Sequence, residues 1–205
     1  MDPILNPRLW AKYFLWRIIG ITAGSQSADD WDQQYASGHW RFLDNLAETA
    51  HYGVIAAWAR RLEPKSVLDV GCGHGVLTDH LKTLPYRDYL GIDLSSQAVT
   101  EAANRHADGR TGFQAADAKA FAPNQLFDLI IFNESLYYLG DPRDVFAHYS
   151  KFLAPGGRFI VSMFGEPCNR VVWNALRKIL SVEDSVTLSN GKSGVNWTIE
   201  LLMPK

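Results

Sequence analysis

A carboxylate and three alternating glycines stand together where an apolar run of the chain ends. Val67–Val70 is short and apolar except for Asp69. Gly71, Gly73 and Gly75 follow at every second position. Glycine is needed where the backbone takes a positive φ, or where a ligand lies against the main chain. Apolar residues at helical spacing come next, and the free N–H groups of that helix would face the same ligand. The pattern predicts a strand, a glycine turn and a helix that bind a small molecule.

A second carboxylate closes the next apolar run. Tyr89–Ser95 reads as the second strand, and Asp93, which lies 24 residues after Asp69, is near its C-terminal end. A carboxylate at this place can accept hydrogen bonds from the two vicinal hydroxyls of a ribose, as in dinucleotide-binding folds. The alternative role for Asp93 is to cap the next helix, although Ser95 or Ser96 can do that. Asp93 favours an adenosine-type ligand without choosing between cofactors.

The glycine turn resembles motif I of the class I methyltransferases that use S-adenosylmethionine, which is acid-x-Gly-x-Gly-x-Gly. The competing interpretation is the G-x-G-x-x-G fingerprint of nicotinamide and flavin folds. That alignment puts Val76 where the third glycine belongs. It also puts Asp69 where those folds usually have an apolar residue. Asp69 could instead hold the ammonium group of S-adenosylmethionine. The resemblance implies S-adenosyl-L-methionine as the cofactor, and an NAD(P)-dependent oxidoreductase is the alternative.

The same resemblance assigns roles to residues outside the turn. It implies that Asp117 bonds the adenine amino group and that the backbone of Ala118 holds a ring nitrogen. Trp31–Trp40 is similar to a W-D-x-x-Y-x-x-G-x-W segment that folds over the cofactor. Tyr35 and Trp40 are therefore candidates for a lid, and the alternative is that their rings are core anchors. The residues expected to bind the cofactor are Tyr35, Trp40, Asp69, Gly71, Cys72, Gly73, Gly75, Asp93, Leu94, Asp117, Ala118 and Asn133.

The remaining patterns predict the architecture. The nearly continuous apolar run Phe127–Phe132 predicts a central strand of a parallel sheet. A helix is expected over 43–62, and the stretches 185–189 and 196–203 predict a hairpin. The resemblance implies an α/β, Rossmann-like fold. Its sheet would be mostly parallel and seven-stranded, in the order 3-2-1-4-5-7-6, with helices on both faces.

Candidate catalytic groups follow the central strand. Asn133, Glu134 and Tyr137 lie at its exit, where open α/β sheets bind ligands. The segment is not N-P-P-Y, the signature of amino-methylating nucleic-acid enzymes. A hydroxyl acceptor requires a base, and Glu134 and His39 are the candidates by position and by pKa range. The expected acceptor is a hydroxyl or amine on a small molecule, sugars and glycan precursors included. A partner subunit that binds the cofactor without turnover is the non-catalytic alternative.

Size and composition bound the class of protein. A chain of 205 residues fits one domain with a substantial core. A net charge of -2 and a pI near 6.3 argue against a nucleic-acid partner. Cys72 and Cys168 form no C-x-x-C pair and no secretory signal is evident, so a cytoplasmic setting is expected. The histidines lack H-x-x-x-H spacing, and no metal site is expected.

The start of the chain differs from the rest. Residues 8–21 are apolar nearly all round and include three basic side chains. The run is too short to span a bilayer, which takes about 20 residues. It could be an interfacial helix in peripheral contact with a membrane, or a helix packed on the domain or on a second subunit. We divide the chain into an apolar helix and linker at 1–28 and an S-adenosylmethionine-binding domain at 29–205.

Overall fold

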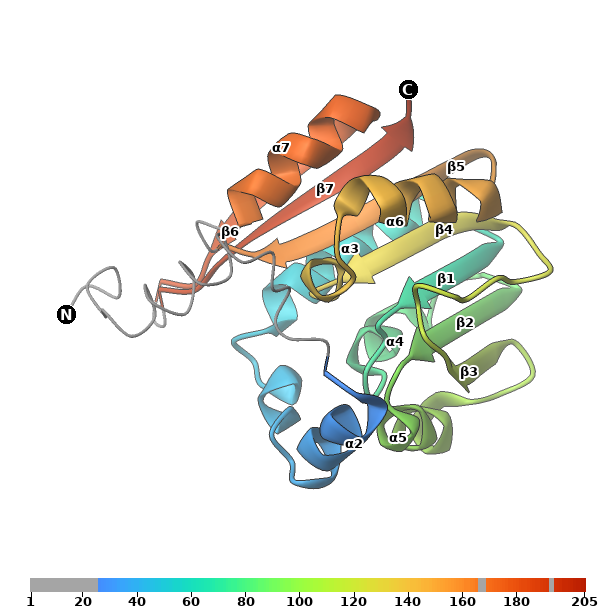
Figure 1. Cartoon of the computed structure of the whole chain (residues 1–205), viewed down its shortest axis with the longest axis vertical. Coiled ribbons are helices and arrows are strands. Elements are labelled where there is room, and N and C mark those ends of the chain that lie inside the picture. The colour runs from blue at the N-terminus through green and yellow to red at the C-terminus, as the bar shows by residue number, and fades with distance from the viewer. Residues whose placement is uncertain (1–25, 166–168, 192–193) are drawn as a thin grey trace.

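A seven-stranded sheet forms the centre of the computed structural model, which describes residues 26–165, 169–191 and 194–205 (Figure 1). The strands are β1 (Ser66–Val70), β2 (Asp88–Asp93), β3 (Thr111–Ala115), β4 (Phe127–Asn133), β5 (Leu153–Phe164), β6 (Leu180–Ser189) and β7 (Asn196–Pro204). Their order is β3-β2-β1-β4-β5-β7-β6. Neighbouring strands from β3 to β5 are parallel, whereas β7 is antiparallel to both β5 and β6. The predicted fold class and strand order are confirmed.

Helices cover both faces of this sheet. They are α2 (Ala28–Ala36), α3 (Thr49–Leu62), α4 (Val76–Leu81), α5 (Ser96–His106), α6 (Pro142–Tyr149) and α7 (Asn169–Ile179), with 3₁₀ helices at Arg41–Asp44, Leu136–Tyr138 and Ser150–Phe152. α6 and α7 lie on one face, and α3, α4 and α5 lie on the other (Figure 1). Within the described residues, none of the helices has the length and apolar character that crossing a membrane requires.

Alternate residues of the central strands supply two hydrophobic cores. Leu68 of β1 and Phe132 of β4 pack with α6 and α7, whereas Val67 and Ile131 pack with α3 and α4. Side chains of a strand alternate between its faces, so Asp69 has the same orientation as Val67. The carboxylate of Asp69 therefore points to the α3 and α4 side of the sheet, close to the C-terminal edge of β1.

The predicted helix over 43–62 begins later than expected. α3 begins at Thr49, and Asn45 has an extended backbone with φ -75° and ψ 151°. The carboxylate of Asp44 lies 2.9 Å from Nε2 of His74, which directly precedes the last glycine of the turn. This contact joins the segment before α3 to the glycine turn, and the extended Asn45 separates that segment from the helix. The hydrophobic spacing alone contained no information about this contact between distant residues.

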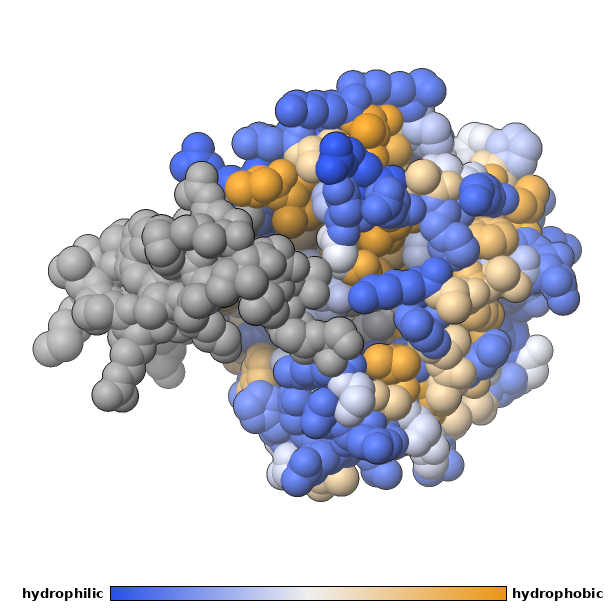
Figure 2. Space-filling model, in the orientation of Figure 1, coloured by the Kyte–Doolittle hydropathy of each residue, from blue (hydrophilic) through white to orange (hydrophobic). Residues whose placement is uncertain are grey.

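The surface mixes polar and apolar side chains. Figure 2 shows one face, on which hydrophilic residues surround smaller apolar areas. Among the described residues, the large hydrophobic side chains that are exposed belong to several different elements: Phe42, Leu46, Leu126, Val171 and Val182. Scattered exposed apolar residues of this kind are ordinary on folded proteins. The surface therefore does not by itself indicate an interface.

Candidate active site

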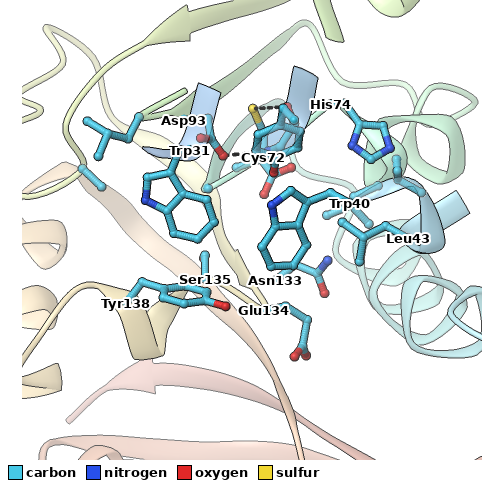
Figure 3. A pocket seen from close by; sticks show the side chains of 18 of the residues that line it. Trp31, Trp40, Leu43, Cys72, His74, Asp93, Asn133, Glu134, Ser135 and Tyr138 are labelled. Atoms are coloured by element: carbon cyan, nitrogen blue, oxygen red, sulfur yellow. Dashed lines mark hydrogen bonds between the residues drawn. The ribbon is translucent and has the colours of Figure 1, made fainter. Parts of the chain in front are cut away.

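A cavity of about 740 Å³ lies at the C-terminal edge of the parallel strands (Figure 3). The turns after β1, β2, β3 and β4 form one wall, and α2 with the segment that follows it forms another. Open α/β sheets bind their ligands at this edge. The predicted site residues that line the cavity are Tyr35, Trp40, Asp69, Gly71, Cys72, Gly73, Asp93, Leu94, Asp117, Ala118, Asn133 and Glu134.

The glycine turn brings two distant segments against the cavity. Gly71 and Gly73 have φ of +79° and +54°, a region that residues with a Cβ rarely adopt. A Cβ on Gly71 would lie 2.4 Å from Cβ of Ser135, and one on Gly73 would lie 2.7 Å from the Tyr35 hydroxyl oxygen. Both glycines are therefore required by conformation and by close approach. The turn fits closely between the lid segment and the exit of β4.

Asp69 presents an unpartnered carboxylate oxygen at the cavity. The residue is 1% exposed, and its Oδ2 accepts a 2.7 Å hydrogen bond from the Tyr89 hydroxyl. Oδ1 is buried and has no hydrogen-bond partner among the described residues. Burial raises the pKa of Asp69 to about 7, although the hydrogen bond from Tyr89 opposes the shift. A buried acceptor without a partner is costly, so a cationic ligand group at this oxygen would be stabilising.

Asp93 is fixed at the end of β2 by backbone donors. The N–H of Gly73 donates to Oδ2 and the N–H of Ser95 donates to Oδ1, each at 2.9 Å. Burial raises the pKa of Asp93, and these two hydrogen bonds offset part of that increase. Each carboxylate oxygen can accept a further hydrogen bond. The side chain is thus held rigidly and can accept two more donors, such as a pair of vicinal hydroxyls.

The wall beyond β3 contains the predicted adenine-binding residues. Asp117 is exposed, and its Oδ1 accepts a 2.9 Å hydrogen bond from the backbone N–H of Lys119. The carbonyl of Ala118 accepts a 2.8 Å bond from the Tyr149 hydroxyl. The structure therefore brings both residues to the cavity at the opposite end from Glu134. Their predicted contacts with an adenine ring remain predictions.

Aromatic rings from the lid segment, which we define as residues 28–44, close over the cavity. The rings of Trp31 and Trp40 have centroids 5.7 Å apart, and those of Tyr35 and Trp40 are 6.2 Å apart. Trp31 also meets Tyr138 edge-on at 5.1 Å, so the lid contacts the segment after β4 (Figure 3). Nε1 of Trp40 is buried and has no hydrogen-bond partner in the described part of the chain. The lid would shield a bound ligand from water and offer it one unused donor.

Polar contacts fasten this lid segment to α5. Asp32 accepts hydrogen bonds from the Ser95 hydroxyl at 2.6 Å and from the backbone N–H of Gln97 at 3.0 Å. It thereby binds the N-terminus of α5, where backbone N–H groups lack intrahelical partners. Arg41 forms an exposed ion pair with Glu101 of the same helix at 2.5 Å. Of the two contacts with α5, that of Asp32 contributes more, because exposed ion pairs contribute little.

Glu134 is held in a strained backbone conformation with a fully bonded carboxylate. Its φ is +55°, which is rare for a residue with a Cβ. Oε1 accepts from the Ser162 hydroxyl at 2.9 Å, and Oε2 accepts from the Phe164 N–H at 2.8 Å and the Tyr137 hydroxyl at 3.2 Å. Burial nevertheless raises the pKa of Glu134 to about 7. Such a group can take a proton near neutral pH.

Two of the predicted site residues do not line the cavity. His39 is exposed, and its ring packs edge-on against Trp40 with centroids 5.1 Å apart. The structure thus places this candidate base outside the cavity lining, and its catalytic role stays a prediction. Gly75 begins α4, and a Cβ there would lie 2.8 Å from the ring of His106 on α5. Gly75 permits close packing of two helices rather than close approach of a ligand.

The structure adds cavity residues that the sequence patterns did not identify. Glu48 and Tyr52 lie one helical turn apart at the start of α3, and Trp197 lies near the start of β7. Trp31 belongs to the quoted lid motif, so the sequence did contain a signal for it. Tyr52 follows Glu48 by four residues, a spacing that puts two side chains on one helical face. Trp197 had no local signal, because only the strand order brings it to this edge.

The arrangement fits a nucleoside cofactor with an amino-acid end. Asp69 offers an unpartnered acceptor for an ammonium group, and Asp93 offers acceptors for ribose hydroxyls. The glycine turn leaves no Cβ between them, and aromatic rings cover the opposite side. The fold and the cavity together define a class I methyltransferase domain, which uses S-adenosylmethionine.

The comparisons with known proteins agree with this class. A family model described as a methyltransferase domain matches residues 38–202, and the chain belongs to this family. Malonyl-[acyl-carrier protein] O-methyltransferase of Hahella chejuensis is 37% identical over 101 residues, which are 48% of this chain and 36% of that protein. Trans-aconitate 2-methyltransferase of an Acidovorax species is 32% identical over 140 residues, 65% of this chain and 50% of that protein. The chain thus spans about half or less of the length of these curated relatives.

A solved structure shares the fold. N-methyltransferase NodS from Bradyrhizobium japonicum, in complex with S-adenosyl-L-homocysteine, superposes with a TM-score of 0.66 and 24% identity. The match covers 80% of this chain and 91% of that chain. At this identity the likeness supports the fold alone. The acceptors named for these relatives differ, so similarity does not select one for this chain.

Proposed function

We propose that this protein transfers the methyl group of S-adenosylmethionine to a hydroxyl or amine on a small molecule, with sugars and glycan precursors among the candidates. The observation that carries the proposal is the unpartnered, buried Oδ1 of Asp69 beside a glycine turn that also fixes Asp93. An ammonium acceptor and a ribose acceptor are thereby combined in one cavity. A pyrophosphate-bearing cofactor would have no use for the buried acid.

The residues of the chain have separate roles in this proposal. Bound S-adenosylmethionine supplies an electrophilic sulfonium methyl group. Asp69 holds the ammonium end, Asp93 holds the ribose, and the rings of the lid segment exclude water. Glu134 takes the proton of the acceptor. Orienting two reactants can contribute up to about 7–11 kcal/mol, so positioning of the acceptor against the methyl group is a large part of the proposed catalysis.

Ligand binding tests the choice of cofactor. We expect S-adenosylhomocysteine to raise the melting temperature of the protein and to give a saturable calorimetric titration. At a ligand concentration of about 100 Kd the stabilisation is about 2.7 kcal/mol. NADH should have no effect, and stabilisation by NADH alone would favour the oxidoreductase alternative. Binding of S-adenosylhomocysteine without methyl transfer to any compound of a metabolite extract would favour the non-catalytic partner subunit.

The N-terminal part of the chain stays a prediction. Residues 8–21, the Cys168 position and most of the proposed linker at 1–28 lie outside the described residues. We propose that residues 8–21 contact a membrane surface or a second subunit while 29–205 forms the cofactor-binding domain. A vesicle-binding assay that compares the full chain with a variant lacking residues 1–25 tests the membrane contact. Cell fractionation tests the predicted cytoplasmic localisation of the protein.

A further inference from the structure

The sheet order divides the cavity into two halves. The turns after β1, β2 and β3 carry the residues assigned to the cofactor, including Asp93 and Asp117. Beyond them, β4, β5 and β7 with the start of α3 enclose a second region, which we call the acceptor half. Its wall is formed by Glu48, Tyr52, Asn133, Glu134, Phe164 and Trp197. A ligand that fills the first half leaves this second region for the acceptor.

The acceptor half carries two carboxylates and no described basic side chain. Glu48 and Glu134 both line it, whereas Lys119 follows Asp117 in the cofactor half. The Glu134 carboxylate is bonded only by neutral donors. Glu48 lies 4.0 Å from Nδ1 of His51, a fully buried ring whose pKa burial lowers to about 3. Within the described chain, both acids therefore lack a cationic partner.

Tyr52 lines the same cavity as the two acids. It is 3% exposed and lines the cavity, and no group in the described part of the chain hydrogen-bonds its hydroxyl. Burial raises the pKa of this hydroxyl, and the charges of Glu48 and then Glu134 raise it further. A hydroxyl without a described partner on the cavity wall can bond a polar group of a ligand. Trp197 and the neighbouring rings add aromatic surface to the same wall.

Acids and aromatic rings together favour a cationic ligand. An ammonium group gains charge-assisted hydrogen bonds from carboxylates and attraction to the faces of aromatic rings. A carboxylate ligand would instead be repelled by the ionised forms of the two acids in this poorly solvated region. A neutral hydroxyl ligand would not compensate the negative charge of either acid. The charge of the wall thus distinguishes amine, hydroxyl and carboxylate acceptors, which the size of the cavity does not distinguish.

We propose that the acceptor is an amine that is cationic at neutral pH, held by Glu48 and Glu134, and that its nitrogen is the methylated atom. This inference rests on the proposed methyltransferase function. The ammonium gives one proton to the Glu134 carboxylate, and the freed nitrogen lone pair forms the new N–C bond. The C–S bond of the sulfonium breaks with its electron pair left on sulfur. The methylated nitrogen ends as an ammonium, and Glu134 returns its proton to water.

Transfer of an isotopic label identifies the methylated atom even while the acceptor is unidentified. The full chain is incubated with ¹³C-methyl S-adenosylmethionine and a metabolite extract, and the labelled product is isolated. We expect a cation exchanger to retain the product at pH about 7, and its methyl chemical shift to be that of an N-methyl group. An O-methyl ether or a methyl ester would overturn the inference and leave the methyltransferase function in place. Absence of transfer would overturn the proposed function, and the inference with it.

Matched variants test the role of the acids on the product found. Glu48→Gln keeps the shape of the side chain and removes its charge. We expect the KM for the amine to rise by about tenfold or more, because a charge-assisted hydrogen bond is lost. The Kd for S-adenosylhomocysteine should be unchanged, which also reports that the variant folds. Glu63→Gln, an exposed acid outside the cavity, is the control. Equal KM values for the two variants would overturn the assignment of Glu48.

Discussion

Two carboxylic acids of the cavity have their pKa raised to about 7, namely Asp69 and Glu134. In both, burial outweighs the hydrogen bonds that stabilise the charged form. The two acids differ in their hydrogen bonds. Oδ1 of Asp69 has no described partner, whereas both carboxylate oxygens of Glu134 accept hydrogen bonds. Asp69 is therefore suited to hold a ligand cation, and Glu134 to exchange a proton without moving. Groups with perturbed pKa values gather at functional sites for this reason.

Removal of the Asp93 carboxylate should weaken cofactor binding. In Asp93→Ala the ribose hydroxyls lose hydrogen bonds worth about 1.5–3 kcal/mol each, so the affinity for S-adenosylhomocysteine should fall by about tenfold or more. Titration calorimetry measures this change. Asp88→Ala is the control, because Asp88 is an exposed acid at the other end of β2. An unchanged Kd for Asp93→Ala would mean that the ribose is held elsewhere.

The rate of methyl transfer should rise with pH through about 7. The base form of Glu134 is the ionised one, and burial raises its pKa to about 7, so the rate is low below this pH and levels above it. Glu134→Gln should lower kcat by about 100-fold or more and remove this inflection. The hydrogen bond from Tyr137 lowers the pKa of Glu134, so Tyr137→Phe should move the inflection to higher pH. A profile of kcat/KM that has the same inflection in Glu134→Gln would contradict this role.

At the scale of elements, the lid segment is positioned by α5 rather than by its own sequence. Local patterns correctly predicted the strand, turn and helix around Gly71, because those preferences act within a few residues. They predicted an uninterrupted helix over 43–62, whereas α3 begins at Thr49 and Asp44 contacts His74 of the glycine turn. Gly75 was expected at the cofactor, and the structure shows its positive φ of +84° and its close approach to His106 of α5. Spacing indicates where a glycine is needed more reliably than why.

Release of the lid segment from α5 should weaken cofactor binding without unfolding the domain. Asp32→Ala removes the carboxylate that accepts from Ser95 and from the N–H of Gln97. We expect the affinity for S-adenosylhomocysteine to fall by about tenfold, in line with a lost charge-assisted hydrogen bond. Trypsin should also cleave after Arg41 faster than in the wild-type protein. Asp29→Ala, an exposed acid in the first turn of α2, should change neither value. Equal effects of Asp32→Ala and Asp29→Ala would show that Asp32 does not attach the lid segment to α5.

At the scale of the whole molecule, the strand order decides which side chains share the cavity. Asp69, Asp93, Glu134 and Trp197 come from β1, β2, the exit of β4 and β7. The parallel strands end at one edge, and the antiparallel β7 begins there. Residues more than 100 positions apart in the sequence are thereby neighbours. The charge and shape of the acceptor half are properties of this arrangement and of no single segment.

Stability should depend on pH through Asp69. Because its folded pKa is raised to about 7, the native state binds more protons than the unfolded state between about pH 4 and 7. The stabilisation is complete below the unfolded pKa and is lost as the pH rises through about 7. His51, whose pKa burial lowers to about 3, acts in the opposite direction. The contribution of Asp69 is therefore measured as the difference in free energy of unfolding between the wild type and Asp69→Asn, obtained by urea denaturation at each pH.

The expected difference has a definite sign. From about pH 5 to about pH 8 the wild type should lose free energy of unfolding relative to Asp69→Asn, by an amount of the order of 1–3 kcal/mol. Saturating S-adenosylhomocysteine should reduce this loss, because its ammonium group pairs with the ionised carboxylate. A difference that is constant with pH would mean that Asp69 is not perturbed by burial.

The sequence by itself determined the class of the protein. A strand, its terminal acid and the glycine turn lie within ten residues, so their conformation follows from local sterics that the residue types specify. Only the tertiary structure decided that Glu48, Tyr52 and Trp197 join Glu134, and that His39 stays outside the cavity. Those positions result from strand order and from packing between distant segments. No local preference of the backbone encodes them.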